Sequence, residues 1–294
     1  MPRSATNSSE IAKTSLPSPK SNLNHLRFSL VGPGRVGSSL AHWITAAGGR
    51  PVTVAERRET SRGRQLAQEL GARWQPLAQC QTDGQDLLLI AVADDAIHGV
   101  AEQLARHPQA RVALHCSGSH TGEILNPLAT VGCALGSIHP LMAFPHPMPD
   151  PAEAARAWFA TDGAPEAVAL AHDLARAFGG TAVEIDGAQR CLYHLAASIA
   201  AGGVATLLTV VDELIQTLDL PQGLLEGYLR LAHGALDRLP KAPFPAAAIT
   251  GPAARGDAIT LERHRQALGA TAPDIVPLVD ALVAMTHRQI ARHG

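Results

Sequence analysis

A glycine-rich turn near the amino-terminal end has the residue types and the spacing that bind the pyrophosphate of a dinucleotide. Gly32, Gly34 and Gly37 form a GxGxxG pattern directly after a short apolar run. In such a turn the first glycine lets the chain leave the strand, the second lets the phosphates approach the backbone, and the third packs a helix against the strand. The free N–H groups of that helix would face the phosphates. The residues predicted to contact the cofactor here are Gly32, Pro33, Gly34, Arg35, Val36 and Gly37.

Charged residues follow the second expected strand, at the place where dinucleotide-binding folds distinguish NAD from NADP. Glu56 lies 24 positions after Gly32 and could hold the adenine ribose hydroxyls of NAD. Arg57 and Arg58 follow, and guanidinium groups suit the 2′-phosphate of NADP. A carboxylate pointing at that phosphate would repel it, so Glu56 must turn away if NADP is bound. We expect NADP, with NAD as the open alternative and an ordinary solvated charge run as the alternative for each arginine.

A third run of candidate residues follows the apolar stretch 87–92. The carboxyl ends of parallel strands form the edge at which α/β sheets bind ligands. Backbone at Val92 and Ala93 would therefore line the cofactor. Asp94 or Asp95 is expected to cap the next helix rather than to take part in catalysis.

The run His-Cys-Ser-Gly-Ser at 115–119 ends another expected strand, beside the predicted position of the nicotinamide. Ser117 could form a hydrogen bond to the substrate or to the cofactor amide, and Gly118 would permit close approach. The alternative is that Ser117 and Ser119 simply cap the next helix. Cys116 has no neighbouring feature that would activate a thiol, so we expect it to be a small apolar filler.

The elements that must position these residues alternate between strands and helices over the first two-thirds of the chain. Strands are expected at 28–31, 52–55, 87–92, 112–115 and 134–138, with weaker candidates at 157–161 and 181–185. Several are almost continuously apolar, as in parallel strands that are covered on both faces. The repeated βα units predict an α/β fold, with a doubly wound, mostly parallel Rossmann sheet followed by an all-helical C-terminal domain.

The periodicity becomes purely helical after Asp186, with helices expected at 187–218, 224–237, 261–268 and 275–292. The predicted organisation is a disordered leader at 1–24, an NAD(P)-binding Rossmann domain at 25–186, and a helical substrate or dimerisation domain at 187–294. The longest apolar run, Leu195–Val211, contains glycines and is short for a membrane span, so we expect a buried helix.

Composition limits the classes of partner. The chain has 294 residues and a formal net charge of -2, which argues against a broad nucleic-acid surface. Its four cysteines are widely spaced and form no CxxC pair, so reduced thiols in a cytoplasmic protein are expected. No HExxH pattern occurs among the 14 histidines, and neither a metal site nor a membrane partner is expected.

Several short runs together carry a family resemblance that covers nearly everything after the leader. They are residues 31–37, 91–97, 115–119, 139–141 and 193–197, and Thr-Gly-Pro-Ala-Ala-Arg-Gly-Asp at 250–257 followed by His264. On these runs the chain resembles bacterial Rossmann-like proteins with a helical C-terminal domain of unassigned function. Those proteins are similar to pyrroline-5-carboxylate reductase and to other 6-phosphogluconate dehydrogenase-like oxidoreductases.

The resemblance implies where catalysis would take place. Related dehydrogenases use a lysine in a comparable helix to donate the proton that accompanies hydride transfer, and His194 lies near that position. An imidazole can donate or accept a proton near neutral pH. Tyr193 and Ser117 are the other catalytic candidates. Family members often carry an asparagine eight positions after the residue that corresponds to His194. This chain has Gly202 there, a departure that points to a different substrate.

The resemblance also implies substrate-binding residues. His139 is a candidate because it lies at the end of an expected strand, and Gly118 because it would permit close approach. Arg255 could hold a substrate carboxylate in a two-point grip, with Asp257 beside it. A network between Arg255 and Asp257 without any ligand is the alternative.

Together these features predict an NAD(P)-dependent dehydrogenase or reductase that transfers a hydride between nicotinamide and a small C=O or C=N substrate. NADP is the expected cofactor, and a homodimer formed through the helical domain is the expected assembly. The alternative is a non-catalytic dinucleotide-binding sensor or assembly protein.

Overall fold

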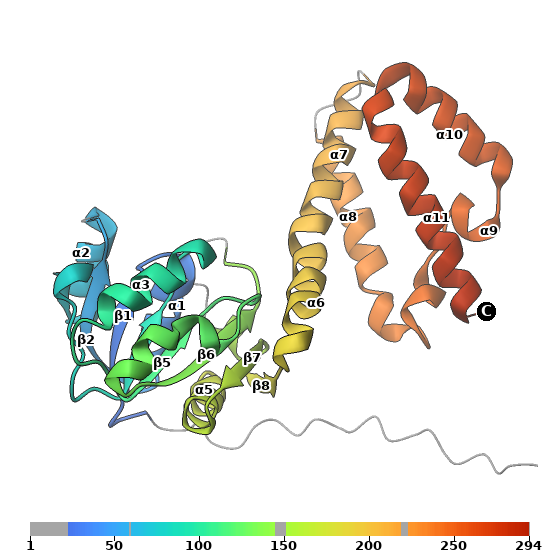
Figure 1. The fold of residues 1–294 in the computed structure, drawn as a ribbon. Coiled ribbons are helices and arrows are strands. Elements are labelled where there is room, and N and C mark those ends of the chain that lie inside the picture. Colours follow the sequence, from blue (N-terminus) through green and yellow to red (C-terminus); the bar gives the residue numbers. More distant parts are fainter. Residues whose placement is uncertain (1–22, 59, 145–150, 219–222, 294) are drawn as a thin grey trace, which may run out of the picture. The chain divides into compact units, whose positions relative to one another are not determined.

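The computed structural model describes residues 23–58, 60–144, 151–218 and 223–293. Most of the expected leader, residues 1–22, therefore lies outside the described residues. The chain divides into two compact units, Met1–Ser198 and Ile199–Gly294, each of which is described by itself (Figure 1). The predicted domain boundary at 186/187 coincides with the start of the helix Gly187–Gln216, and the division between the two units falls within that helix.

An eight-stranded sheet in the order β3-β2-β1-β4-β5-β6-β7-β8 forms the centre of the described first unit. Pairing is parallel from β3 through β6, β7 runs antiparallel to β6, and β8 runs parallel to β7. The strands are β1 (Arg27–Val31), β2 (Arg50–Glu56), β3 (Arg73–Pro76), β4 (Leu87–Ile90), β5 (Val112–His115), β6 (Ala134–Leu141), β7 (Trp158–Gly163) and β8 (Thr181–Glu184). The mostly parallel α/β sheet is therefore confirmed.

Helices cover the sheet on both faces. Successive residues of each strand point to opposite sides, so each central strand contributes side chains to two cores. In β4, Leu87 and Leu89 pack into one core, whereas Leu88 and Ile90 pack into the other. The first core contains residues from α1 (Arg35–Ala46), α2 (Ser61–Leu70) and α5 (Pro165–Ala177), and the second from α3 (Ile97–Leu104) and η3 (Gly122–Val131). This arrangement explains the nearly continuous apolar runs of the central strands.

The last helix of the first unit is α6 (Gly187–Ser198), which follows β8 directly. The second unit is helical throughout its described residues and has a small core around Leu268, Ala272 and Ile275. It begins with the π-helical turn η4 (Ile199–Gly203). Its longer helices are α7 (Val204–Gln216), α8 (Leu224–Leu236), α10 (Ala258–Thr271) and α11 (Val276–His293). The predicted all-helical C-terminal region is confirmed.

The expectation of a buried helix at Leu195–Val211 is wrong for this chain by itself. The continuous helix Gly187–Gln216 is 30 residues long, its most apolar 18-residue stretch has a mean hydropathy of 1.7, and none of that stretch is buried. By length and composition alone it could cross a membrane. Leu192 is 71% exposed and Ile199 is 61% exposed. An apolar sequence indicates that a surface is to be covered, but it does not reveal whether the covering surface belongs to the same chain.

Candidate active site

In the glycine turn between β1 and α1, packing requires a glycine at positions 32 and 37 but not at position 34. Gly32 has φ +93°, and a Cβ there would lie 2.5 Å from the Ala91 carbonyl oxygen. A Cβ on Gly37 would overlap the Gly32 carbonyl oxygen. Gly34, the N-cap of α1, has φ −72°. A Cβ added there would have the Ala91 carbonyl oxygen, at 3.9 Å, as its nearest neighbour. Packing within the described chain therefore does not explain Gly34, whereas a ligand against its backbone would.

A cleft of about 540 Å³ opens beside this glycine at the carboxyl ends of β1, β4 and β5. The chain order changes direction between β1 and β4, and doubly wound sheets bind ligands in the crevice outside such a point. The cleft is lined by Gly34, Arg35, Val36, Ala91, Val92, Ala93, Asp94, Cys116, Ser117 and Phe144. It brings together three regions that the sequence analysis selected separately: the glycine turn, the residues after β4 and the residues after β5.

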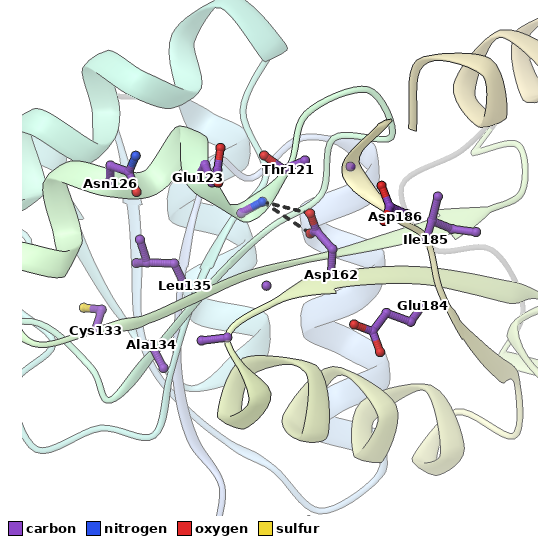
Figure 2. A pocket seen from close by; sticks show the side chains of 14 residues that line it. Thr121, Glu123, Asn126, Cys133, Ala134, Leu135, Asp162, Glu184, Ile185 and Asp186 are labelled. Carbon is purple, nitrogen blue, oxygen red and sulfur yellow. Dashed lines mark hydrogen bonds between the residues drawn. The ribbon is translucent and has the colours of Figure 1, made fainter. Parts of the chain in front are cut away.

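A second cavity, of about 550 Å³, is acidic (Figure 2). Its lining includes the carboxylates of Glu123, Asp162, Glu184 and Asp186. Those charges would repel the phosphates of a dinucleotide. Within the described residues, no group of three or more His, Cys, Asp or Glu side chains is arranged to hold a metal. The cleft beside Gly34 is therefore the candidate site for the cofactor.

Neither Asp94 nor Asp95 caps the helix that follows β4, so that expectation is wrong. The turn η2 (Asp94–Ala96) precedes α3, and α3 has Ala96 at its N-cap with no side-chain hydrogen bond. The Asp94 carboxylate instead accepts a hydrogen bond of 2.9 Å from the hydroxyl of Ser119. This bond links the residues after β4 to the loop after β5.

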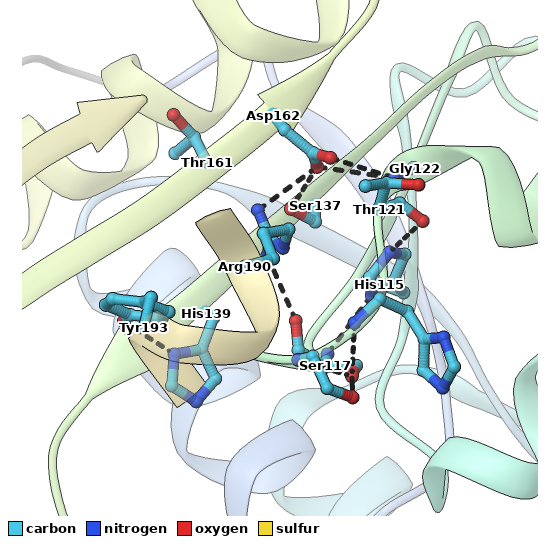
Figure 3. A network of polar contacts seen from close by, with 12 residues as sticks. His115, Ser117, Thr121, Gly122, Ser137, His139, Thr161, Asp162, Arg190 and Tyr193 are labelled. Carbon is cyan, nitrogen blue, oxygen red and sulfur yellow. Dashed lines mark hydrogen bonds and ion pairs between the residues drawn. The ribbon is translucent and has the colours of Figure 1, made fainter. Parts of the chain in front are cut away.

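The loop after β5 is held by His115, a residue to which the sequence analysis gave no role. The Ser117 N–H donates to His115 Nδ1 at 3.1 Å, and His115 Nε2 lies 3.0 Å from the Thr121 carbonyl oxygen (Figure 3). A carbonyl can only accept, so the proton is on Nε2 and Nδ1 is the acceptor. Burial lowers the pKa of His115 to about 4, which keeps the ring in this neutral form.

Ser117 holds the next turn of the loop and does not cap a helix. Its hydroxyl oxygen accepts hydrogen bonds from the backbone N–H groups of Ser119 and His120. The helix η3 has Thr121 at its N-cap, without a side-chain bond. The half-buried Cys116 beside it is not an activated thiol, because burial raises the pKa of its thiol to about 12.

Two imidazoles meet at Gly118. A Cβ on that glycine would lie 2.6 Å from Cδ2 of His194 and 2.8 Å from Nε2 of His139. The two rings are edge to face, with their centroids 5.9 Å apart. Nδ1 of His139 lies 2.8 Å from the hydroxyl of Tyr193 (Figure 3). The structure thus brings together Ser117, Gly118, His139, Tyr193 and His194, all within the first unit.

Burial affects the protonation of His139 and Tyr193. Burial, together with the neighbouring His194 and Arg190, lowers the pKa of His139 to about 4. Burial also raises the pKa of the Tyr193 hydroxyl. Both groups are therefore neutral near pH 7. The His194 ring is half-buried and forms no hydrogen bond with the described residues, so its nitrogens are available to a ligand.

A buried charge pair that the sequence analysis missed attaches α6 to the sheet. The Arg190 side chain is 0% exposed, its Nη1 lies 3.4 Å from Asp162 Oδ1, and its Nη2 donates to the Ser117 carbonyl oxygen at 3.1 Å (Figure 3). Asp162 also accepts hydrogen bonds from the Gly122 N–H and the Ser137 hydroxyl. Arg190 precedes Tyr193 and His194 by three and four positions, and that spacing, which places all three on one helix face, could have revealed it.

The Glu56 side chain at the end of β2 is turned into the protein. Its carboxylate is buried against Thr60 and Trp74, and it is not part of the cleft lining. Arg57 and Arg58 are exposed beside it.

Arg255 and Asp257 belong to the second unit. Arg255 ends the short helix α9 (Pro252–Arg255), and Asp257 is the N-cap of α10. The Asp257 carboxylate accepts bonds from the backbone N–H and the hydroxyl of Thr260, and these bonds lower its pKa. Helix capping thus accounts for Asp257, and substrate binding by Arg255 and Asp257 stays a prediction.

The fold defines a Rossmann-type unit followed by a helical unit. Residues 14–140 match the family described as a Rossmann-like domain, and residues 157–286 match DUF2520, a domain of unknown function. The chain therefore combines a Rossmann-like domain with a DUF2520 domain, as its resemblance implied. No curated protein sequence matches it significantly.

Solved structures share this fold at low sequence identity. BF3122 of Bacteroides fragilis, to which an NADP oxidoreductase activity has been ascribed, is 22% identical with a TM-score of 0.75, over 91% of this chain and 100% of that one. TM1727 of Thermotoga maritima is 22% identical with a TM-score of 0.71, over 90% and 98%. Plasmodium falciparum pyrroline carboxylate reductase with NADP bound is 12% identical with a TM-score of 0.59, over 92% and 100%. At these identities the likeness establishes the fold.

Proposed function

We propose that this protein is an NADP-dependent oxidoreductase that transfers a hydride between nicotinamide and a small C=O or C=N compound. The observation that carries the proposal is the cleft that runs from the glycine turn to Ser117. At Ser117 the cleft reaches a loop whose next residue, Gly118, is flanked by His139 and His194. A dinucleotide cleft that leads to two imidazoles and a tyrosine provides both cofactor binding and proton transfer.

The residues of this chain have separate tasks in that reaction. NADPH, when bound, supplies a hydride to the carbon of the substrate double bond. The heteroatom then gains an electron pair and requires a proton, which His194 donates; in the oxidative direction the same ring accepts it. Nε2 of His139 faces the same loop and holds the substrate, while Tyr193 orients His139 through Nδ1.

The choice of NADP rests on charge. Among the similar structures, BF3122 has an ascribed NADP oxidoreductase activity, and the Plasmodium falciparum pyrroline carboxylate reductase has NADP bound. In this chain Arg57 and Arg58 are exposed at the end of β2, where guanidinium groups can bind a 2′-phosphate. The Glu56 carboxylate, which would repel that phosphate, bonds to Thr60 and Trp74 instead.

The function is tested by titrating the protein with NADPH and then screening small metabolites for a change in the absorbance of the reduced nicotinamide. Saturable binding followed by oxidation or reduction of a carbonyl or imine compound would support the proposal. Binding without turnover of any compound would favour a dinucleotide sensor. No binding of either NADPH or NADH would exclude both functions.

The Gly34→Ala variant should lose NADPH affinity by at least about tenfold while its thermal stability stays close to that of the wild type. The added methyl group meets no close protein atom, but it would occupy the space of the pyrophosphate. Titration calorimetry measures the loss. Gly99→Ala, on the exposed face of α3 with no atom within 4 Å of the new Cβ, is the matched control and should bind normally. Equal affinity in both variants would show that the turn does not bind the cofactor.

We also propose that two copies of the chain associate through the helical region. The support is the most apolar stretch of the helix Gly187–Gln216, which the described chain leaves uncovered. Light scattering should then give twice the 30.7 kDa of one chain. An Ile199→Glu variant should be monomeric, because it places a charge on an apolar surface that association would bury. A wild-type monomer at micromolar concentration would contradict this assembly.

A further inference from the structure

The indole N–H of Trp74 donates a hydrogen bond to Glu56, and we propose that this contact keeps the carboxylate away from a bound cofactor and so determines the preference for NADPH over NADH. The inference rests on the proposed function and adds the residue that selects between the two cofactors. It concerns the end of β2, where an acidic residue would ordinarily hold the ribose hydroxyls of NAD.

The Glu56 carboxylate is occupied by groups that belong to the protein. Oε1 accepts hydrogen bonds from the indole N–H of Trp74 at 2.8 Å and from the backbone N–H of Thr60 at 2.9 Å. Oε2 accepts the hydroxyl of Thr60 at 2.8 Å. Glu56 is only 7% exposed, although it ends a strand at the edge where the ribose would bind. The carboxylate therefore points into the protein.

Two further contacts shape this position. Trp74 lies on β3, which pairs with β2, and the guanidinium carbon of Arg64 lies 4.3 Å from the centroid of its ring. Helix α2 approaches the carboxylate so closely that a Cβ on Gly63 would overlap Glu56 Oε1. The strand, the helix and the indole together hold the carboxylate in its orientation toward Thr60 and Trp74.

The electrostatic consequence differs between the two cofactors. With the Glu56 carboxylate withdrawn, Arg57 and Arg58 present only positive charge to a 2′-phosphate. A carboxylate released toward the same place would repel the phosphate of NADPH and would accept hydrogen bonds from the ribose hydroxyls of NADH. Loss of the restraint should therefore change the two affinities in opposite directions, whereas general damage to the fold would lower both.

The Trp74→Phe variant removes the indole N–H and keeps an aromatic ring. Titration with NADPH and NADH in parallel should show weaker NADPH binding, stronger NADH binding, and an affinity ratio that falls by about tenfold or more. Adding Glu56→Gln to Trp74→Phe removes the released charge and should restore the NADPH preference. Trp158→Phe, at an exposed tryptophan on β7, is the matched control and should keep the wild-type ratio.

A second variant reaches the same carboxylate without changing Trp74. In Gly63→Ala the new methyl group overlaps Glu56 Oε1 and should expel the side chain, with the same fall in the NADPH to NADH ratio. Gly99→Ala is again the control. Agreement between the two variants would support the inference even if one of them folds poorly.

The outcomes separate the inference from the proposed function. A wild type that prefers NADPH, with Trp74→Phe and Gly63→Ala variants that keep its ratio, would overturn the inference and leave the function standing. A wild type that prefers NADH would overturn the inference as well. A wild type that binds neither cofactor would overturn the proposed function itself.

Discussion

A His194→Ala variant should turn over about 10²–10⁴-fold more slowly than the wild type while binding NADPH almost normally. The reason is geometric. The ring lies beside Gly118, past the Ser117 end of the cleft, and forms no hydrogen bond with the described residues that would suggest a structural task. It is also absent from the residues that line the cofactor cleft. Turnover with the substrate found by the metabolite screen, together with NADPH titration, measures the two effects separately.

Neighbouring variants make this expectation specific. His98→Ala removes an exposed histidine of α3 and should leave turnover unchanged. Tyr193→Phe removes only the hydroxyl that bonds to His139, so a smaller loss is expected than for His194→Ala. If His194→Ala retained full turnover, this histidine would be excluded, and Ser117 and His139 would become the candidates for proton transfer.

The parts of the fold that the sequence predicted best are those in which local pattern and burial coincide. The strand β5 (Val112–His115) has the predicted bounds, because both of its faces are covered and three of its four residues are apolar. The strand β3 (Arg73–Pro76) was not predicted, since it is a short segment at the sheet edge with polar residues and a proline. Edge strands have only one neighbour, so fewer apolar residues are needed to hold them.

The candidate site was predictable one strand end at a time, but its internal contacts were not. The glycine turn and the residues after β4 and β5 each carry a local signal, and the topology brings them to one cleft. The direction of the Glu56 side chain depends on Trp74, which is 18 residues away on another strand. The attachment of α6 depends on Arg190 and on Asp162 of β7. Such pairings arise from tertiary structure, and neither spacing nor composition encodes them directly.

The Arg190→Met variant should lose about 3–5 kcal/mol of unfolding free energy, because it leaves the Asp162 carboxylate buried without its cation. Urea unfolding followed by tryptophan fluorescence measures this loss in the relevant unit, since Trp43, Trp74 and Trp158 all belong to the first unit. Arg111→Met breaks the exposed pair with Glu166 and should cost no more than about 1 kcal/mol.

The double variant Arg190→Met with Asp162→Asn tests whether the cost comes from the unpaired charge. Asparagine is neutral and can still accept hydrogen bonds from the Gly122 N–H and the Ser137 hydroxyl, so much of the lost stability should return. If the double variant were no more stable than Arg190→Met, the stabilising contribution of Arg190 would instead be its packing and its bond to the Ser117 carbonyl. Because Arg190 shares a helix face with Tyr193 and His194, either result would show how α6 is held where those two side chains can reach Gly118.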